Sequence, residues 1–401
     1  MRYALSALLW LLLSLSPGIA VAQEQAPAPT ISLLTFAPGE IYWQRFGHNA
    51  LLVREPGGRR NVYNYGVFDF QQKNFFLNFA RGHMLYQLVE QPLYDTLRAY
   101  HHEGRWAYEQ QLDLDETQRR ELAAFLSWNA WPQNAEYRYD YFRSNCSTRV
   151  RDAIDRVLGG ELQRQLQAQP AGVSYRFEAT RLIGPVRPLF FGMDAVMGAD
   201  GDVGLDRWQQ SFVPMELMEA VRGVRLRDAA GVERPLVRSE GWLVHSDLPR
   251  EPAQPPAVLP ALLALGLLLA AALLLLSRHR GRAAARWAHA TLACSIALAC
   301  GLGGLVLLAI WGLTEHWVMW ANRNLLLFSP LCLALLPLWL RSFRSHWRIV
   351  AWERGLVLLV LAAAVLSLPL LLLPGAQQNL PWIALLLPLH AALAWTLHRS
   401  R

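Results

Sequence analysis

The sequence predicts a mixed α+β domain exported from the cytoplasm, followed by an all-α domain of five transmembrane helices. Three observations support this: a secretory signal at the N-terminus, strand-like segments followed by helix-like segments, and five long apolar runs near the C-terminus. We therefore expect a signal peptide (1–22), an exported domain (23–250, core at about 30–190), a linker (251–256) and a transmembrane domain (257–401).

The N-terminal segment has the features of a secretory signal. Arg2 gives the positive start, residues 4–15 are apolar, and Ala20 and Ala22 form a small-residue cleavage site. An uncut segment would instead anchor the same domain from its other end. Because Gln23 and not a cysteine follows the site, we expect that the protein is not itself a lipoprotein.

The first part of the exported domain contains strand-like segments. Residues 30–36 are apolar and rich in β-prone side chains. Residues 49–53 and 61–68 flank a Pro-Gly-Gly turn at 56–58, which predicts a β-hairpin. His48 begins the first arm of this hairpin.

Two helices are expected further along the domain. The first covers residues 114–130, where apolar residues recur at helical spacing. Two acidic residues are candidates to cap it, Asp113 and Asp115. The second begins after Asn145, a favoured N-cap residue, and ends at the two glycines 159–160. Its apolar face is predicted to contain Cys146, Val150, Ala153, Ile154 and Val157.

Five apolar runs each approach the roughly 20 residues that a helix needs to cross a bilayer. They are 257–276, 290–313, 325–340, which is the shortest, 356–373 and 380–397. Arginines gather between runs one and two, between runs three and four, and after run five: Arg278, Arg280, Arg282, Arg286, Arg341, Arg344, Arg348, Arg354, Arg399 and Arg401. By the positive-inside rule these segments and the C-terminus are cytoplasmic. The exported domain therefore lies on the periplasmic side of a bacterial inner membrane.

Composition and missing motifs argue against several classes of function. The chain has 38 Lys+Arg against 31 Asp+Glu, but without the cytoplasmic arginines the exported domain is slightly acidic, so we expect no nucleic-acid partner. Lys73 is the only lysine, which argues against a Ser–Lys dyad or a Schiff base. The sequence contains no P-loop, dinucleotide fingerprint or Gly-x-Ser-x-Gly motif.

Cys146 is the single cysteine of the exported domain, whereas the apolar runs contain Cys294, Cys300 and Cys332. A lone thiol in an oxidising compartment has no disulfide partner within its domain, so Cys146 is a candidate nucleophile. At a helix N-terminus, backbone amides stabilise a thiolate and bind an oxyanion. This makes Asn145 and Ser147 part of the expected oxyanion region. The alternative is a small buried side chain without chemistry.

His48 is the expected general base. A thiol nucleophile needs a base, and the base needs a third group that fixes its tautomer. The second hairpin arm offers three candidates for this group: Asn64, Tyr65 and Asp69. The alternative is that His48 is a surface residue or a hydrogen-bonded structural one.

Other candidate sites are weaker. His83 could serve as a second base or a substrate contact, although a structural role fits it better. His101 and His102 are adjacent and point apart on a regular element, so they do not predict a metal site. Residues 200–206 lack the ligand spacing and terminal Glu of a calcium loop and fit a tight turn. We expect neither a metal nor another cofactor.

Four motifs resemble those of the Lnb family. They are Phe-Gly-His-Asn-Ala-Leu (46–51), Val-Tyr-Asn-Tyr-Gly-Val-Phe-Asp-Phe (62–70), the 79–83 segment and Tyr-Asp-Tyr-Phe-Arg-Ser-Asn-Cys-Ser-Thr-Arg (139–149). The resemblance extends to the plan of an exported domain followed by five membrane helices, so it covers nearly all of the chain.

The resemblance implies a fold and an activity. The fold is a permuted papain-like α+β fold, as in lecithin:retinol acyltransferase-like and NlpC-type enzymes. The activity is lipoprotein N-acylation, in which a phospholipid or lipoprotein donates an acyl chain to the N-terminal amine of a diacylated lipoprotein. The resemblance makes Cys146 the nucleophile and His48 the base, and it leaves Asn64 and Tyr65 as candidates for the third residue.

Two alternatives remain open from the sequence. The same cysteine and histidine would also serve an NlpC-like peptidase or amidase that acts on the cell wall. A non-catalytic membrane scaffold or sensor would contain the same domains without using the thiol.

Overall fold

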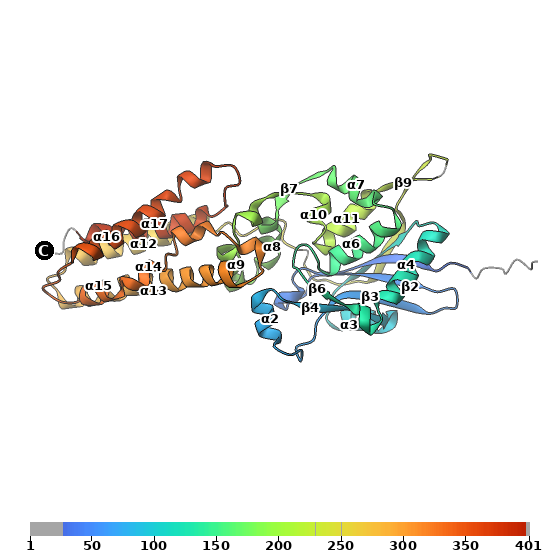
Figure 1. Cartoon of the computed structure of the whole chain (residues 1–401), viewed down its shortest axis with the longest axis horizontal. Coiled ribbons are helices and arrows are strands. Elements are labelled where there is room, and N and C mark those ends of the chain that lie inside the picture. The colour runs from blue at the N-terminus through green and yellow to red at the C-terminus, as the bar shows by residue number, and fades with distance from the viewer. Residues whose placement is uncertain (1–26, 229, 250, 398–401) are drawn as a thin grey trace, which may run out of the picture.

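The computed structural model describes residues 27–228, 230–249 and 251–397. A sheet-containing domain and a bundle of helices lie end to end along the long axis of the molecule (Figure 1). The expected combination of an α+β domain with a helical C-terminal region is therefore confirmed at this level. The predicted signal peptide (1–22) lies outside the described residues.

Within the described residues, seven strands form an antiparallel sheet in the order β11-β5-β1-β2-β3-β4-β6. These strands are β1 (Thr30–Phe36), β2 (His48–Arg54), β3 (Arg60–Val67), β4 (Leu85–Pro92), β5 (Ala107–Leu112), β6 (Glu136–Arg138) and β11 (Val237–Val244). Two small ribbons pair β7 (Pro170–Ser174) with β8 (Gly204–Asp206) and β9 (Arg225–Arg227) with β10 (Glu233–Pro235).

Helices cover both faces of the large sheet. Those of this domain are α2 (Phe75–Arg81), α3 (Leu93–His102), α4 (Glu116–Asn129), α5 (Pro132–Ala135), α6 (Cys146–Val157), α7 (Glu161–Gln167), α8 (Tyr175–Ile183), α9 (Arg187–Val196), α10 (Arg207–Gln210) and α11 (Pro214–Gly223), with short 3-10 turns η1 (Tyr42–Gln44) and η2 (Ala199–Asp202). Because strand side chains alternate, Leu51 and Tyr63 face α4 and α6, whereas Phe36 and Leu52 face α3.

The sequence located the elements around His48 and Cys146 closely. The predicted strand 30–36 is β1, and the predicted hairpin is β2 and β3. Each predicted helix has a capping box, with Asp115 as the N-cap of α4 and Asn145 as the N-cap of α6. The other capping candidate, Asp113, instead forms an ion pair with Arg234.

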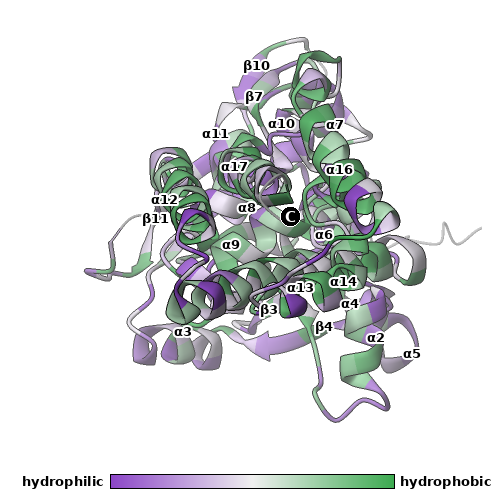
Figure 2. Ribbon diagram, turned by 90° about the vertical axis from the view of Figure 1, so that its left-hand side faces the viewer, coloured by the Kyte–Doolittle hydropathy of each residue, from purple (hydrophilic) through white to green (hydrophobic). Residues whose placement is uncertain are grey.

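The second part of the chain is helical and apolar (Figure 2). Its elements are α12 (Leu259–Arg278), α13 (Ala283–Leu313), η3 (Trp317–Met319), η4 (Arg323–Leu326), α14 (Leu331–Ala334), α15 (Leu336–Arg341), α16 (Ala351–Leu366), η5 (Pro369–Leu372) and α17 (Leu380–Thr396). Among the described residues, three helices are long and apolar enough to cross a membrane: Leu259–Arg278, Ala283–Leu313 and Ala351–Leu372. The apolar helix α17 is shorter.

The third predicted span differs from the structure. The expectation of one continuous helix over 325–340 is wrong, because this stretch consists of η4, α14 and α15. Pro330 directly precedes α14, and Pro337 lies in the first turn of α15. Proline has no N–H and clashes with the preceding turn, so it breaks a continuous helix.

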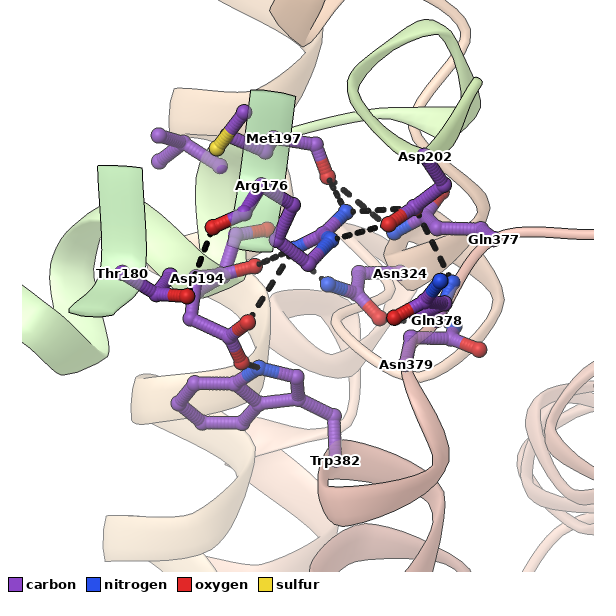
Figure 3. A network of polar contacts seen from close by, with 12 residues as sticks. Arg176, Thr180, Asp194, Met197, Asp202, Asn324, Gln377, Gln378, Asn379 and Trp382 are labelled. Atoms are coloured by element: carbon purple, nitrogen blue, oxygen red, sulfur yellow. Dashed lines mark hydrogen bonds and ion pairs between the residues drawn. The ribbon is translucent and has the colours of Figure 1, made fainter. Parts of the chain in front are cut away.

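A buried ion network joins the two parts of the molecule (Figure 3). The Arg176 guanidinium on α8 lies 2.7 Å from Asp202 Oδ1 and 3.2 Å from Asp194 Oδ1. From the helical part, Trp382 Nε1 donates to Asp194 Oδ2 at 2.8 Å, and the Gln378 amide donates to Asp202 Oδ2 at 3.0 Å. Both acids therefore connect Arg176 to the start of α17. The 200–206 stretch, for which a turn was expected, supplies part of this junction.

Side-chain amides extend the same junction. Asn322 Nδ2 donates to Ala195 O at 2.9 Å, and Gln377 Nε2 donates to Asn322 Oδ1 at 2.9 Å. Asn379 Nδ2 donates to Asn324 Oδ1 at 2.8 Å. Because these groups are buried and hydrogen-bonded, the sheet domain has a defined position on the ends of the membrane helices.

Candidate active site

Cys146 is the first residue of α6, where backbone amides lack partners within the helix. Asn145 Oδ1 accepts from the Thr148 amide at 2.9 Å, and Thr148 Oγ1 accepts from the Asn145 amide at 2.7 Å. The capping box does not use the backbone amides of Cys146 and Ser147, and these two N–H groups lie close to the Cys146 sulfur. The thiol therefore lies in a cradle of N–H donors at a helix N-terminus.

The helix is attached to β2 through buried polar side chains. Ser147 Oγ lies 2.8 Å from Asn49 Oδ1 and 2.6 Å from the Ser211 carbonyl oxygen. Asn49 Nδ2 in turn donates to Thr35 Oγ1 at 2.9 Å. The Ser147 side chain thus fixes α6 on the sheet, and only its backbone amide is available to the expected oxyanion region.

His48 begins β2 and makes a defined hydrogen bond. Its Nε2 lies 3.2 Å from Asn64 Oδ1 on β3, and its ring stacks on Phe36 with 5.9 Å between centroids. An amide oxygen only accepts, so Nε2 bears the proton in the neutral ring and Nδ1 has the free lone pair. Of the three candidates for the third group, Asn64 is the one whose side chain is hydrogen-bonded to His48.

The strands that contain His48 and Asn64 separate near the thiol. Pairing between β2 and β3 begins at Leu51 and Tyr63 and continues towards the turn, so His48 and Asn64 lie outside the paired stretch. Strand β3 also has a bulge against β4 between Asn64 and Val67. Gly66 lies in this bulge with φ 88°, and a Cβ added there would lie 3.3 Å from Cys146 Cβ. The absence of a side chain at Gly66 thus leaves space for Cys146.

Cys146 and His48 approach this opening from different faces of the sheet. The body of α6 covers the face formed by Leu51, whereas His48 lies on the face of Phe36 and α3. The Cys146 sulfur nevertheless accepts a hydrogen bond from the backbone amide of Asn49, the residue that follows His48. The thiol therefore contacts the backbone of β2 at the residue that follows His48.

Both groups are electrically neutral at pH 7. Burial raises the pKa of the Cys146 thiol, although backbone N–H groups and the charge of Arg105 act in the opposite direction. Burial also lowers the pKa of His48 to about 4, where the Asn64 hydrogen bond raises it and Arg105 lowers it further. A helix N-terminus was expected to stabilise a thiolate, but here desolvation outweighs the amides.

Four side chains near the thiol were missed by sequence reasoning. Arg105 donates to Ala37 O at 2.8 Å and lies over the Tyr100 ring at 4.6 Å. The charge of a Cys146 thiolate raises the pKa values of Tyr100, Tyr137 and Tyr139, after burial as the main cause. Tyr139 belongs to the Cys146 motif and was detectable from it. Arg105 follows a helix end and has no local signal.

Comparison with protein families identifies both parts of the molecule. A family model for the Lnb N-terminal periplasmic domain matches residues 20–180, and one for the Lnb transmembrane domain matches residues 253–399. The chain belongs to the Lnb family. This Lnb family member is a membrane protein with a periplasmic N-terminal domain. No match was found among curated proteins or among solved structures.

The other site candidates of this Lnb family member have structural partners. Tyr65 Oη donates to Asn129 Oδ1 at 2.7 Å, and Asp69 Oδ1 accepts from the Gln71 amide at 2.8 Å. His83 Nε2 lies 2.8 Å from Glu315 Oε1, at the junction with the membrane helices. In the described part of the chain, no group of three His, Cys, Asp or Glu residues is arranged to hold a metal ion.

The loop before Cys146 contacts the membrane part directly. Asp140 Oδ1 accepts from the amides of Phe142 and Arg143 at 2.9 and 2.8 Å, which closes the turn. Asp140 Oδ2 accepts from Trp317 Nε1 at 2.9 Å, and the Arg143 guanidinium lies 3.6 Å from the centre of the Trp317 ring. Trp317 follows α13, so the periplasmic end of this span positions the loop that leads to the thiol.

Proposed function

We propose that this Lnb family member is a cysteine-dependent acyltransferase of the inner membrane, with a papain-like periplasmic domain and a cytoplasmic C-terminus. Cys146 accepts an acyl chain from a phospholipid or lipoprotein ester and passes it to the N-terminal amine of a diacylated lipoprotein. The observation that supports this most is the cradle of amides around the Cys146 sulfur, which includes the amide of the residue after His48, a histidine whose tautomer leaves Nδ1 free.

The first half-reaction starts from a neutral pair. His48 Nδ1 takes the thiol proton as Cys146 Sγ attacks the ester carbonyl carbon, since a thiol of raised pKa does not ionise in advance. The amides of Cys146 and Ser147 stabilise the oxyanion. The carbon–oxygen ester bond then breaks, and His48 returns its proton to the leaving alcohol. The product is a thioester on Cys146 and a lysolipid.

The second half-reaction transfers the chain to nitrogen. An amine attacks the thioester carbonyl, loses a proton to His48, and expels the Cys146 sulfur, which regains the proton from His48. The result is an amide and the original enzyme. Asn64 holds the His48 ring in one tautomer through both halves, since its oxygen accepts from Nε2 at 3.2 Å.

The junction between the two parts supports a lipid substrate over a soluble one. The loop that leads to Cys146 is bonded to Trp317 at the end of α13, and the Arg176 network fixes the domain against α17. A protein that acts on a soluble peptide has no need for this attachment to spans. The attachment keeps the thiol near the periplasmic lipid surface.

Acyl transfer is tested by intact-protein mass spectrometry of the full chain in phospholipid nanodiscs. The wild type is expected to gain the mass of a fatty acid minus water, in a hydroxylamine-sensitive form, and to lose it when a diacylated lipopeptide is added. Cys146→Ala is expected to gain no acyl adduct, and His48→Asn is expected to gain it at about a hundredth of the wild-type rate.

Three outcomes contradict the proposal. An adduct retained in Cys146→Ala removes the thiol from the mechanism. Cleavage of muropeptides without any lipid adduct identifies a cell-wall peptidase or amidase instead. Full cellular function of Cys146→Ala, with no adduct in the wild type, indicates a scaffold.

A further inference from the structure

A cluster of aromatic side chains projects from the sheet domain around α2. We name it the aromatic rim, and its members are Tyr42, Trp43, Phe68, Phe70, Phe75 and Phe76. Ring centroids are 4.9 Å apart for Phe68 and Phe70, and 5.1 Å apart for Phe70 and Phe75. The rim is therefore one contiguous apolar surface, formed by the η1 turn and the segment from β3 to α2.

The rim is exposed to an unusual degree for aromatic residues. Phe76 is 74% exposed and Phe70 52%, and the neighbouring Leu77 is 48% exposed. Helix α2 buries none of its residues. Contiguous apolar patches of this kind mark interaction surfaces, because water contact with them is unfavourable.

Contacts with the end of a transmembrane helix fix the level of the rim. Helix α13 ends at Leu313, and the amide of Glu315 donates to the carbonyl oxygen of Arg81 at the end of α2, at 2.8 Å. His316 Nε2 lies 3.2 Å from Phe79 O. Helix α2 thus lies beside the periplasmic end of a span, where lipid headgroups meet acyl chains.

Helix α2 of the rim also lies to the side of the membrane helices, which do not cover it (Figure 2). Viewed from the end of the helical part, α2 projects beyond the bundle and is not hidden behind it (Figure 2). In Figure 1 the same helix lies at the level where the helical part meets the sheet domain. Aromatic residues at this depth are typical of membrane interfaces.

A row of aromatic rings connects the rim with the thiol. Phe68 lies 5.2 Å from Tyr86, and Tyr86 lies 4.2 Å from Tyr139, between ring centroids. Tyr139 is half-buried and lies close enough to Cys146 for a thiolate there to raise its pKa, after burial as the main cause. A continuous row of packed aromatic rings therefore leads from the exposed surface towards the nucleophile.

We propose that the aromatic rim inserts into the periplasmic leaflet of the bilayer and admits the acyl chain of the phospholipid donor to Cys146. The proposed insertion depends only on the exposure and position of the rim. The role as donor entrance rests on the proposed acyltransferase function.

Insertion is tested by photocrosslinking of the full chain in nanodiscs of phosphatidylethanolamine and phosphatidylglycerol. A benzoylphenylalanine replaces Phe76 in one variant and Tyr94 in the other. These residues are matched in exposure, at 74% and 72%, but Tyr94 lies at the start of α3, beyond the far end of the eight-residue strand β4 that follows α2. We expect about tenfold more lipid adduct at position 76 than at position 94. Equal adducts at both positions, or none at 76, would overturn the proposal.

The entrance is tested by two charged variants and two donors. Phe76→Asp is expected to slow acylation of Cys146 by bilayer phospholipid about tenfold, and to leave acylation by a soluble short-chain thioester within about twofold. Tyr94→Asp is expected to change neither rate. Equal slowing with both donors contradicts an entrance. Lipid adducts at 76 without any acylation of wild-type Cys146 would leave the insertion standing and remove the proposed function.

Discussion

The neutral state of the Cys146–His48 pair predicts the pH dependence of an ordinary un-ionised thiol and not that of a thiolate–imidazolium pair. The pKa of Cys146 is raised by burial, whereas a free cysteine has a pKa near 8.5, so below about 3% of the thiol is ionised at pH 7. The pKa of His48 is lowered to about 4, so the imidazole has no charge above about pH 5 and does not stabilise a thiolate. Alkylation by iodoacetamide should therefore increase about tenfold per pH unit from pH 6 to pH 8.

Asn64→Asp is the perturbation that tests this reasoning. A carboxylate at the place of Asn64 Oδ1 would lie 3.2 Å from His48 Nε2. Coulomb's law gives about 5 kcal/mol for this pair at an effective dielectric constant of about 20. The resulting imidazolium favours the thiolate, and we expect alkylation at pH 7 to increase at least about tenfold.

The assay is intact-protein mass spectrometry of the full chain after timed alkylation, with Cys146→Ala to subtract the other cysteines. Asn64→Ala is the matched control, because it removes the hydrogen bond without adding a charge and should not speed alkylation. A wild-type rate that is already constant between pH 5 and pH 8 would refute the neutral pair. It would indicate a preformed thiolate–imidazolium pair instead.

Three further substitutions test the architecture around the thiol. Gly66→Ala should slow alkylation of Cys146 about tenfold, because the new Cβ lies 3.3 Å from Cys146 Cβ. Gly58→Ala is the control, because Gly58 has the same left-handed backbone in open space, and it should not slow alkylation. Asn145→Ala removes the N-cap of α6, so it should lower the free energy of unfolding by about 1 kcal/mol and slow alkylation of Cys146. Asp115→Ala removes the N-cap of α4 and should lower only the free energy of unfolding, as measured by denaturation. Arg176→Met leaves two buried carboxylates unpaired and should destabilise the detergent-solubilised protein by about 3 kcal/mol; an unchanged thermal midpoint would contradict the role of the ion network.

Local patterns were enough to predict the elements that contain the site. The hairpin of β2 and β3 follows from alternating apolar residues around a Pro-Gly-Gly turn, and α6 from Asn145 and the two glycines at its end. These signals act over a few residues, so they can be read from the chain alone. The same local reasoning failed at 325–340, where apolar composition hid the effect of two prolines.

The choice among site residues needed the tertiary structure. Asn64, Tyr65 and Asp69 were equivalent in the sequence, and only the register and the bulge in β3 bring Asn64 to His48. Arg105 comes to the site from a loop beyond α3 without any local sign. Such neighbours are set by strand pairing across many residues, which a sequence pattern does not encode.

By itself, the sequence determined one strand, the hairpin and two helices around the site, the lone thiol of the exported domain and the division between sheet domain and membrane helices, because residue composition and spacing act locally. The tertiary structure alone decided that the pKa of the thiol is raised and not lowered, since burial by distant segments outweighs the amides of the helix N-terminus. It also decided which aromatic rings remain exposed beside a span. Both properties arise from desolvation, which exists only once the chain has packed.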